Sequence, residues 1–362
     1  MALKGNKGEW SEIYTLLKLL GEGKVYAGDQ NLNKIRDLFY PIIMIMRHEN
    51  DGDYNYKTVD RNIRIETADG EVLLVLPASL FLEESETLLE VIRACDGAFS
   101  APRAEEFMNR IYCRTLKAKS KDKTDIRIVL HDRRTGLDSD MGFSIKSQLG
   151  GNSTLLNASG ATNLNFKIVG ADLSDEDIEQ INSINSPKDK VIKRVQAIKE
   201  KGGSLVFDKT DNPIFARNLN MLDCAMQRFV AALLLEQLES GVSTLPELVH
   251  LCAEKDVLHV GCTNDVETYE YKAKHLLTST ALGMMPATYW NGRFDANGGY
   301  LVVKKDGEIL CYHFYDRNRF EDFLFCNAYL ERSSTTRHHY ASIVKEEDGS
   351  LSFKLNIQIR LK

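Results

Sequence analysis

Two strand-like runs joined by a short polar turn decide the fold of this chain. The first run is Asp125-Ile-Arg-Ile-Val-Leu-His-Asp132, and the second is Met141-Gly-Phe-Ser-Ile-Lys-Ser-Gln148. The connection, Arg133-Arg-Thr-Gly-Leu-Asp-Ser139, is too short for a crossover, so the two strands must form an antiparallel hairpin. Because side chains alternate along a strand, Ser144 and Lys146 take one face and the apolar residues beside them take the other.

Folding this hairpin brings Asp125, at the start of the first strand, close to Lys146 and Gln148, at the end of the second. A carboxylate and an ammonium group placed in this way, together with a divalent cation, are the minimal apparatus for hydrolysis of a phosphodiester. Asp125 alone could simply begin a strand. Lys146, however, interrupts an apolar run on a strand expected to be central, and a buried lysine needs a partner. The pair therefore favours a functional interpretation.

A helix near the N-terminus offers a third charged group. From Glu9 to Leu20 the apolar residues recur at helical spacing, which predicts an amphipathic helix. Asn6 and Glu9 have the spacing of a capping box, and we expect Gly21 to end the helix. Since Glu9 is used by the cap, Glu12 is the better candidate for a metal ligand.

The composition is that of a globular protein of 362 residues, 43% hydrophobic and 27% charged, which excludes a disordered, collagen-like or coiled-coil chain. The formal net charge of -6 excludes a polybasic protein but not a nucleic-acid partner, because binding depends on where the cations cluster. The 7 cysteines form no Cys-x-x-Cys pair, which argues against a disulfide framework or a zinc site. The sequence shows no signal peptide and no apolar run of membrane length, so we expect a cytoplasmic protein without membrane contacts.

The other runs predict an α/β (α+β) protein with a mixed β-sheet flanked by helices. We expect helices at Glu84–Cys95, Ala104–Tyr112 and Lys188–Lys201, and one long buried helix from about Leu219 to Glu239. A boundary near Pro286 would divide the chain into a core of residues 1–285 and a β-rich C-terminal region of residues 286–362. We expect the aromatic residues of Tyr289-Trp-Asn-Gly-Arg-Phe294 to pack in the core, the commoner fate of such side chains.

Several stretches resemble a known family. Asp125, Ser144-Ile-Lys146 and the upstream Gly-x-x-x-Glu helix look like the PD-(D/E)XK nuclease fold. Four longer stretches, distributed over the whole chain, resemble the HpaII-type type II restriction endonucleases. They are Gly5-Asn-Lys-Gly-Glu-Trp-Ser-Glu-Ile-Tyr14, Gly142-Phe-Ser-Ile-Lys-Ser-Gln-Leu-Gly150, Thr154-Leu-Leu-Asn-Ala-Ser159 and Phe353-Lys-Leu-Asn-Ile-Gln-Ile-Arg360.

This resemblance implies a Mg²⁺-dependent endonuclease that cleaves both strands of duplex DNA at a short palindrome, CCGG for the namesake of the family, leaving 5′-phosphates. Asp125 would be the metal-binding acid and Lys146 the catalytic lysine, while the Ile145 carbonyl and Glu12 would complete the metal shell. Ser144 stands where the fold carries a second acid, a departure that bears on the number of metal ions and the strength of their binding. A palindromic site implies a homodimer at least on DNA, and a restriction system implies a cognate DNA methyltransferase.

Three groups of residues are candidates for DNA contacts. The run from Arg110 to Arg127 is basic and adjoins the proposed active site, where phosphates must lie. A polar loop follows the hairpin, and a basic loop spans Arg332 to His339. Each group could also be an ordinary solvated segment. The candidate residues are Lys119, Lys121, Asn152, Ser153, Thr154, Asn157, Arg332, Arg337 and His338.

Two alternatives stay open. A structure-specific nuclease of the junction-resolvase type would carry a similar N-terminal Lys-Gly-x-x-x-Glu motif, although such enzymes are typically short. A catalytically inactive DNA-binding protein would account for Ser144 in place of an acid.

Overall fold

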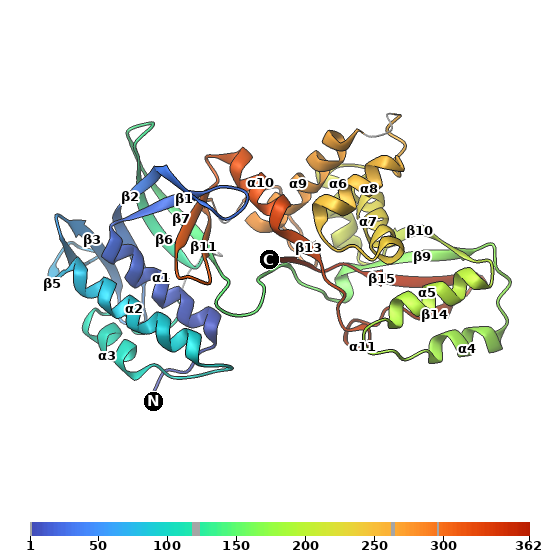
Figure 1. The fold of residues 1–362 in the computed structure, drawn as a ribbon, viewed down its shortest axis with the longest axis horizontal. Helices are drawn as coiled ribbons and strands as arrows, with labels where there is room; N and C mark the ends of the chain where they lie inside the picture. The colour runs from blue at the N-terminus through green and yellow to red at the C-terminus, as the bar shows by residue number, and fades with distance from the viewer. Residues whose placement is uncertain (1, 118–123, 262–264, 295–296) are drawn as a thin grey trace. The chain divides into compact units, whose positions relative to one another are not determined.

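The computed structural model describes residues 2–117, 124–261, 265–294 and 297–362. The chain divides into two compact units (Figure 1). The first contains Met1–Ser153 and Phe294–Phe323, and the second contains Thr154–Arg293 and Leu324–Lys362. The sequence-based boundary near Pro286 lies inside the second unit. Both units combine helices with β-sheets, so the expected mixed α/β class is confirmed.

The first unit is built on a nine-stranded sheet. The sheet is mixed, since β1 pairs with β12 and β11 pairs with β7 in parallel, whereas the other neighbours are antiparallel. In spatial order, its strands are β1 (Lys24–Gly28), β12 (Ile309–His313), β11 (Gly299–Val303), β7 (Leu137–Ser147), β6 (Ile126–Asp132), β2 (Lys34–His48), β3 (Asp53–Val59), β4 (Asn62–Thr67) and β5 (Val72–Pro77).

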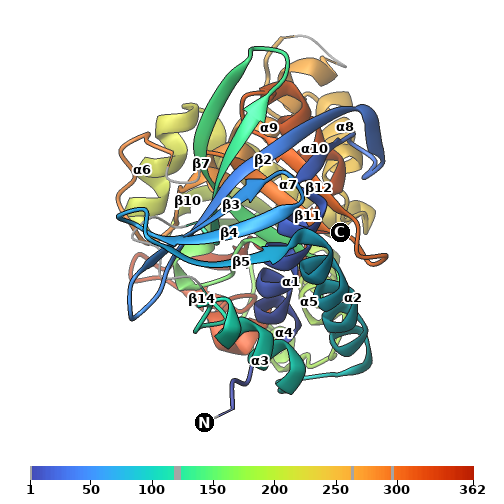
Figure 2. The same ribbon diagram turned by 90° about the vertical axis from the view of Figure 1, so that its left-hand side faces the viewer.

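The length of β2 closes part of this sheet on itself. The first half of the strand pairs with β1, as in Val25 opposite Tyr40. The second half pairs with β6 and β3, as in Ile45 opposite Ile128 and Tyr56. The strands β1, β12, β11, β7, β6 and β2 therefore form a closed ring of pairings, and β3 to β5 continue from β2 as a meander (Figure 2).

Helix α1 (Lys7–Glu22) covers this sheet and packs against α2 (Ala78–Ala94) (Figure 2). The predicted capping box is confirmed, because Asn6 accepts from the Glu9 N–H and Glu9 accepts from the Asn6 N–H. The predicted end at Gly21 is wrong, since the helix continues to Glu22 and Gly23 adopts the left-handed conformation. At Gly21 a Cβ would lie 2.7 Å from the backbone nitrogen of Leu82 on α2. Gly21 therefore permits close packing of the two helices and does not end the first one.

Two further helices belong at least partly to the first unit. The predicted helix at Ala104–Tyr112 is observed as α3 (Pro102–Arg110). Helix α10 (Arg317–Asn327) begins in the first unit and ends in the second.

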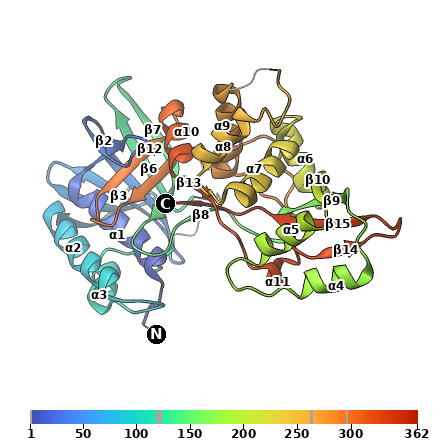
Figure 3. The ribbon, with the colours of Figure 1, turned by 45° about the vertical axis from the view of Figure 1, so that its right-hand side comes forward.

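The second unit contains two smaller sheets and most of the remaining helices (Figure 3). One sheet has the order β10 (Ser204–Thr210), β9 (Asn163–Val169), β15 (Leu351–Asn356) and β14 (Ile343–Lys345). The other has the order β13 (Ala328–Leu330), β16 (Ile359–Leu361) and β8 (Thr154–Leu156). The helices are η1 (Gly160–Thr162), α4 (Asp175–Ser183), α5 (Lys190–Glu200), α6 (Pro213–Leu222), α7 (Met226–Ser240), α8 (Leu245–Glu254), α9 (Val266–Leu282) and α11 (Thr335–His338).

The single long helix predicted from Leu219 to Glu239 is wrong. Two helices, α6 and α7, occupy this stretch and are separated at Asp223, whose backbone is extended. The Asp223 carboxylate accepts a hydrogen bond from the Ala225 N–H at 2.7 Å, which stabilises the turn between the two helices. None of the helices in the described ranges is long and apolar enough to cross a membrane.

We expect Gly21→Ala to lower the thermal stability of the protein. The added methyl group would overlap backbone atoms of Leu82, and overpacking of this kind costs about 1–3 kcal/mol. That cost exceeds the gain of up to about 1 kcal/mol in helix propensity. The unfolding midpoint measures the effect, with Gly160→Ala as the control because no heavy atom lies within 4 Å of its Cβ position. Equal midpoints for both variants would contradict the prediction.

Candidate functional site

The hairpin predicted from the sequence lies in the middle of the nine-stranded sheet. Strands β6 and β7 pair antiparallel, with Ile126 opposite Phe143, which confirms the expected connection. The other edge of β7 pairs in parallel with β11, where Tyr300 lies opposite Ser144 and Val302 opposite Lys146. Both neighbours of β7 are therefore strands.

Asp125 immediately precedes β6, and two hydrogen bonds hold it against β7. Its backbone N–H donates to the Phe143 carbonyl at 2.9 Å. Its carboxylate oxygen Oδ2 accepts from the Ile145 N–H at 2.7 Å. The side chain therefore lies along the β7 backbone, next to the residue that precedes Lys146.

Lys146 is half-buried, and its ammonium group lies over the ring of Tyr300 at 4.7 Å from the centroid. Burial lowers the pKa of Lys146, and the negative charges of Asp125 and Glu12 oppose this shift. Tyr300 is itself buried, and its pKa is raised by burial and by the charge of Asp125. The Lys146 ammonium thus has an aromatic face and two carboxylates for neighbours.

Glu12 projects from α1 and is half-buried. Burial and the charge of Asp125 raise its pKa to about 8, while Lys117 and Arg47 oppose this shift. Two carboxylates from different elements therefore repel one another in a partly desolvated place. Such a pair is neutralised either by a proton or by a cation.

The position of α1 relative to β7 is fixed by a pair of serines. The Ser11 hydroxyl donates to the Lys7 carbonyl at 2.6 Å and lies 2.7 Å from the Ser147 hydroxyl. Because the only proton of Ser11 is used within the helix, Ser147 is the donor in the second bond. This bond joins the helix that carries Glu12 to the strand that carries Lys146.

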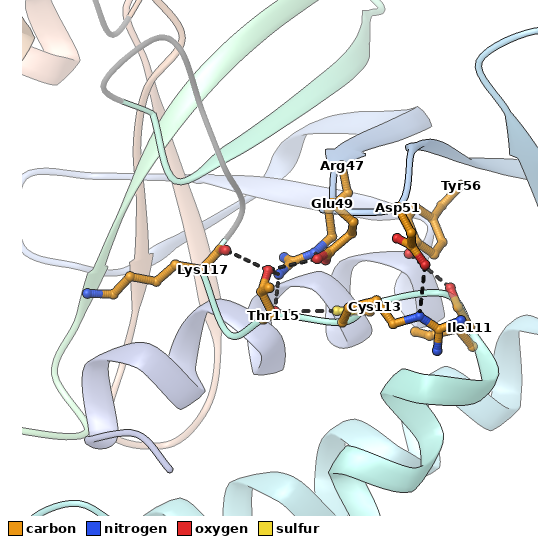
Figure 4. A network of polar contacts seen from close by, with 9 residues as sticks. Arg47, Glu49, Asp51, Tyr56, Ile111, Cys113, Thr115 and Lys117 are labelled. Carbon is orange, nitrogen blue, oxygen red and sulfur yellow. Dashed lines mark hydrogen bonds and ion pairs between the residues drawn. The ribbon is translucent and has the colours of Figure 1, made fainter. Parts of the chain in front are cut away.

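A buried network beside the site was not recognised in the sequence (Figure 4). Arg47 and Glu49, at 6% and 2% exposure, form an ion pair, and Arg47 also donates to the Thr115 carbonyl. The Thr115 hydroxyl lies 2.8 Å from Glu49 Oε2 and 2.7 Å from the Lys117 carbonyl, so its proton serves one of these acceptors at a time. An Arg and a Glu two residues apart at the end of an apolar strand are the sequence signal that could have indicated this pair.

Lys117 extends from this network towards the carboxylates. Its ammonium forms an ion pair with Glu9 at 3.1 Å, and this contact raises the pKa of Lys117. It also interacts electrostatically with Glu12 and Asp125. Lys117 belongs to the basic run noted in the sequence, whereas Lys119 and Lys121 of that run lie outside the described residues.

The donor atoms at this place suit a hard divalent cation. Glu12 and Asp125 supply carboxylate oxygens, which Mg²⁺ prefers, and their mutual repulsion would be relieved by a positive ion. Ser144 is buried at 8% exposure and adds a hydroxyl instead of a third carboxylate. Accordingly, the described residues contain no cluster of three or more His, Cys, Asp or Glu side chains that could hold a metal ion.

The other residues singled out in the sequence are distributed over both units. Asn152 and Ser153 follow β7 in the first unit, and the Ser153 hydroxyl lies 3.5 Å from the Ser147 carbonyl. Within the second unit, β8 begins at Thr154, and α11 occupies part of the stretch that was expected to be a loop. The residues in this second unit are Thr154, Asn157, Arg332, Arg337 and His338.

Comparisons with known proteins give one consistent result. A model of the HpaII restriction endonuclease family matches residues 6–361. The type II restriction enzyme HpaII of Haemophilus parainfluenzae is 40% identical over 358 residues, which cover 98% of this chain and 98% of that protein. No solved structure matches the chain.

We expect Glu12→Gln to stabilise the protein at pH 8 in the presence of a chelator, and not at pH 4.5. Between the ordinary value of 4.5 and about 8, folded Glu12 keeps a proton that the unfolded chain releases. The free energy of unfolding therefore falls as the pH rises through this window, and the neutral glutamine removes that loss. The gain is a few kcal/mol at most, since each pKa unit corresponds to about 1.4 kcal/mol.

Unfolding midpoints of the two proteins, measured from pH 4.5 to 8.5, test this prediction. Glu22→Gln is the control, because Glu22 lies at the other end of α1 in an ion pair with Lys18. A difference between wild type and Glu12→Gln that does not change with pH would contradict the expected coupling.

Proposed function

The chain belongs to the HpaII restriction endonuclease family, and from this premise we propose that it cleaves both strands of duplex DNA at a short palindrome. Membership makes the protein a type II site-specific deoxyribonuclease, a hydrolase that acts on DNA. The finer features proposed are recognition of CCGG, dependence on Mg²⁺ and the production of 5′-phosphate ends. We also propose a cytoplasmic location and a cognate DNA methyltransferase that protects the host DNA.

One observation supports the active site in particular. Two carboxylates and one ammonium group, from α1, the start of β6 and β7, interact electrostatically with one another. In the proposed PD-(D/E)XK arrangement, Asp125 and Glu12 hold a Mg²⁺ ion with the help of the Ile145 carbonyl. Ser144 occupies the place of the second acid and contributes a hydroxyl.

The chemistry follows from these positions. A bound Mg²⁺ ion would supply a Lewis acid for the scissile phosphate and lower the pKa of a coordinated water. Lys146 orients the attacking water. Because burial lowers the pKa of its ammonium group, Nζ exchanges a proton with that water more readily. Water adds its oxygen to phosphorus, the bond to the 3′-oxygen breaks and that oxygen takes up a proton. The ends are then a 5′-phosphate and a 3′-hydroxyl.

DNA contacts are proposed for residues near the site and in the second unit. Backbone phosphates would meet the basic run that contains Lys119 and Lys121, and polar side chains would approach the bases or backbone. Cleavage of both strands at a palindrome further suggests a homodimer at least on DNA. The polar and basic candidates are Asn152, Ser153, Thr154, Asn157, Arg332, Arg337 and His338.

We expect the purified protein with Mg²⁺ to cut plasmid DNA into discrete, reproducible fragments whose ends all lie at one short sequence. Gel electrophoresis and sequencing of the ends measure the outcome, and a chelator should stop the reaction. A smear, or cutting only at four-way junctions, would favour a structure-specific nuclease. Binding without any cutting would favour an inactive DNA-binding protein. This is the second candidate function, because Ser144 stands in the place of an acid.

We expect Asp125→Ala and Lys146→Ala each to lower the cleavage rate about 100-fold or more, because each removes a group that acts on the reacting atoms. DNA binding should be largely retained. The matched control is Asp140→Ala. Asp140 lies on β7, the strand of Lys146, but forms an exposed ion pair with Arg127 at 2.5 Å. Full activity of either active-site variant would overturn the assignment of these residues.

A further inference from the structure

An aromatic stretch expected to be buried is exposed on the second unit. Tyr289 has 70% of its surface exposed, and the neighbouring Met285 and Met221 have 38% and 44%. Met221 lies beside this stretch, since a Cβ at Gly292 would be 3.8 Å from its Cε. The expectation that the aromatic residues of this stretch would pack in the core is therefore wrong for Tyr289, and also for Phe294, which has 38% of its surface exposed. Large apolar side chains that gather at a surface mark places of contact with a partner.

The loop that carries Tyr289, residues 285–293, is held by one buried amide. Asn218 on α6 is fully buried, and its Nδ2 donates to the Met285 carbonyl at 3.0 Å and the Thr288 carbonyl at 2.8 Å. Its Oδ1 accepts from the Trp290 N–H at 3.2 Å and from Arg217 at 3.1 Å. All four hydrogen-bonding positions of the amide are thus used. Tyr289 is therefore exposed on a loop that these hydrogen bonds hold in place.

Basic groups adjoin this aromatic residue. The guanidinium of Arg217 donates to the Trp290 carbonyl at 2.6 Å and lies 5.4 Å from the centre of the Tyr289 ring. Lys209 is exposed at the end of β10 and lines one shallow groove with Arg217 and Met221. Thr210 also lines this groove, but its hydroxyl oxygen is buried.

The acidic residues next to this groove are neutralised. Asp211, which lines the groove itself, pairs with Lys354 at 2.6 Å, and Asp208 pairs with Lys167 at 3.4 Å. Among the described residues, no carboxylate forms an ion pair with Lys209 or Arg217. The surface therefore offers positive charge and an aromatic ring together.

We propose that Lys209, Arg217, Met221 and Tyr289 form an aromatic–basic patch that binds duplex DNA. This inference rests on the proposed function and adds a contact surface to it. Lysine and arginine neutralise backbone phosphates, and aromatic or apolar side chains contact bases and sugars. Charge complementarity favours DNA over a second copy of this chain, since that copy would present the same positive charge.

Three variants test the patch through binding of a fluorescent duplex in a chelator, which prevents cleavage. Lys209→Ala should reduce the slope of log K against log salt by about 0.9, the value for one lost phosphate contact. Tyr289→Ala should weaken binding roughly tenfold, whereas Tyr289→Phe, which keeps the ring, should bind like wild type. Arg217 is left unchanged because it holds the loop.

Matched controls come from the same unit. Lys201→Ala removes an exposed lysine paired with Asp177 at 2.7 Å, and Tyr271→Ala removes a tyrosine with 62% exposure. Neither control should change the affinity or the salt slope, and unfolding midpoints should confirm that every variant is folded. Unchanged binding by Lys209→Ala and Tyr289→Ala would overturn the proposal. A Tyr289→Ala variant that loses self-association, and not DNA affinity, would assign the patch to a second copy.

The test separates this inference from the proposed function. Duplexes with and without CCGG are compared, and the patch is judged by affinity and salt slope on both. Equal binding of the two duplexes by the wild type would contradict the proposed CCGG recognition. The expected reduction of the salt slope in Lys209→Ala would still support the patch in that case.

Discussion

The hydrogen bond from the Ile145 N–H to the Asp125 carboxylate is the constraint on which the candidate site depends. It ties the residue before β6 to the backbone of β7, so the acid cannot turn into solvent. Lys146 follows Ile145 directly, and strand alternation sends its side chain to the face where Tyr300 lies. One backbone donor thus determines how close an acid and an ammonium group come, and the serine pair between α1 and β7 adds Glu12 to the same place.

This arrangement is unfavourable for the isolated chain. Glu12 and Asp125 repel one another in a partly desolvated position, and Lys146 is held where burial disfavours its charge. A core that served only stability would separate or replace these groups. The surrounding fold tolerates them because β7 lies between two strands and α1 is anchored at its capping box. Charge repulsion and desolvation concentrated at one place are typical of a functional site.

The sequence predicted those features that depend on local patterns. The hairpin and the capping box of α1 follow from residues close together in the chain. The pairing of β7 with β11 joins segments far apart in the sequence, so neither Tyr300 nor the placement of β11 and β12 in the large sheet could be foreseen. Gly21 was mistaken for a helix end because a close helix contact and a cap both require glycine. The exposure of Tyr289 depends on Asn218, a buried polar residue whose loop partners lie far away in the sequence.

In both units, buried polar side chains fix the position of the residues next to them. Arg47 and Glu49 are removed from water and satisfied by one another and by Thr115, which leads directly to Lys117. Asn218 uses every hydrogen-bonding position to fix the loop that carries Tyr289. Burial of such groups costs free energy unless they are fully paired, and full pairing permits only one local geometry. The exposed Lys117 and Tyr289 beside these groups are therefore held in defined positions before DNA binds. This lowers the conformational entropy that is lost on binding.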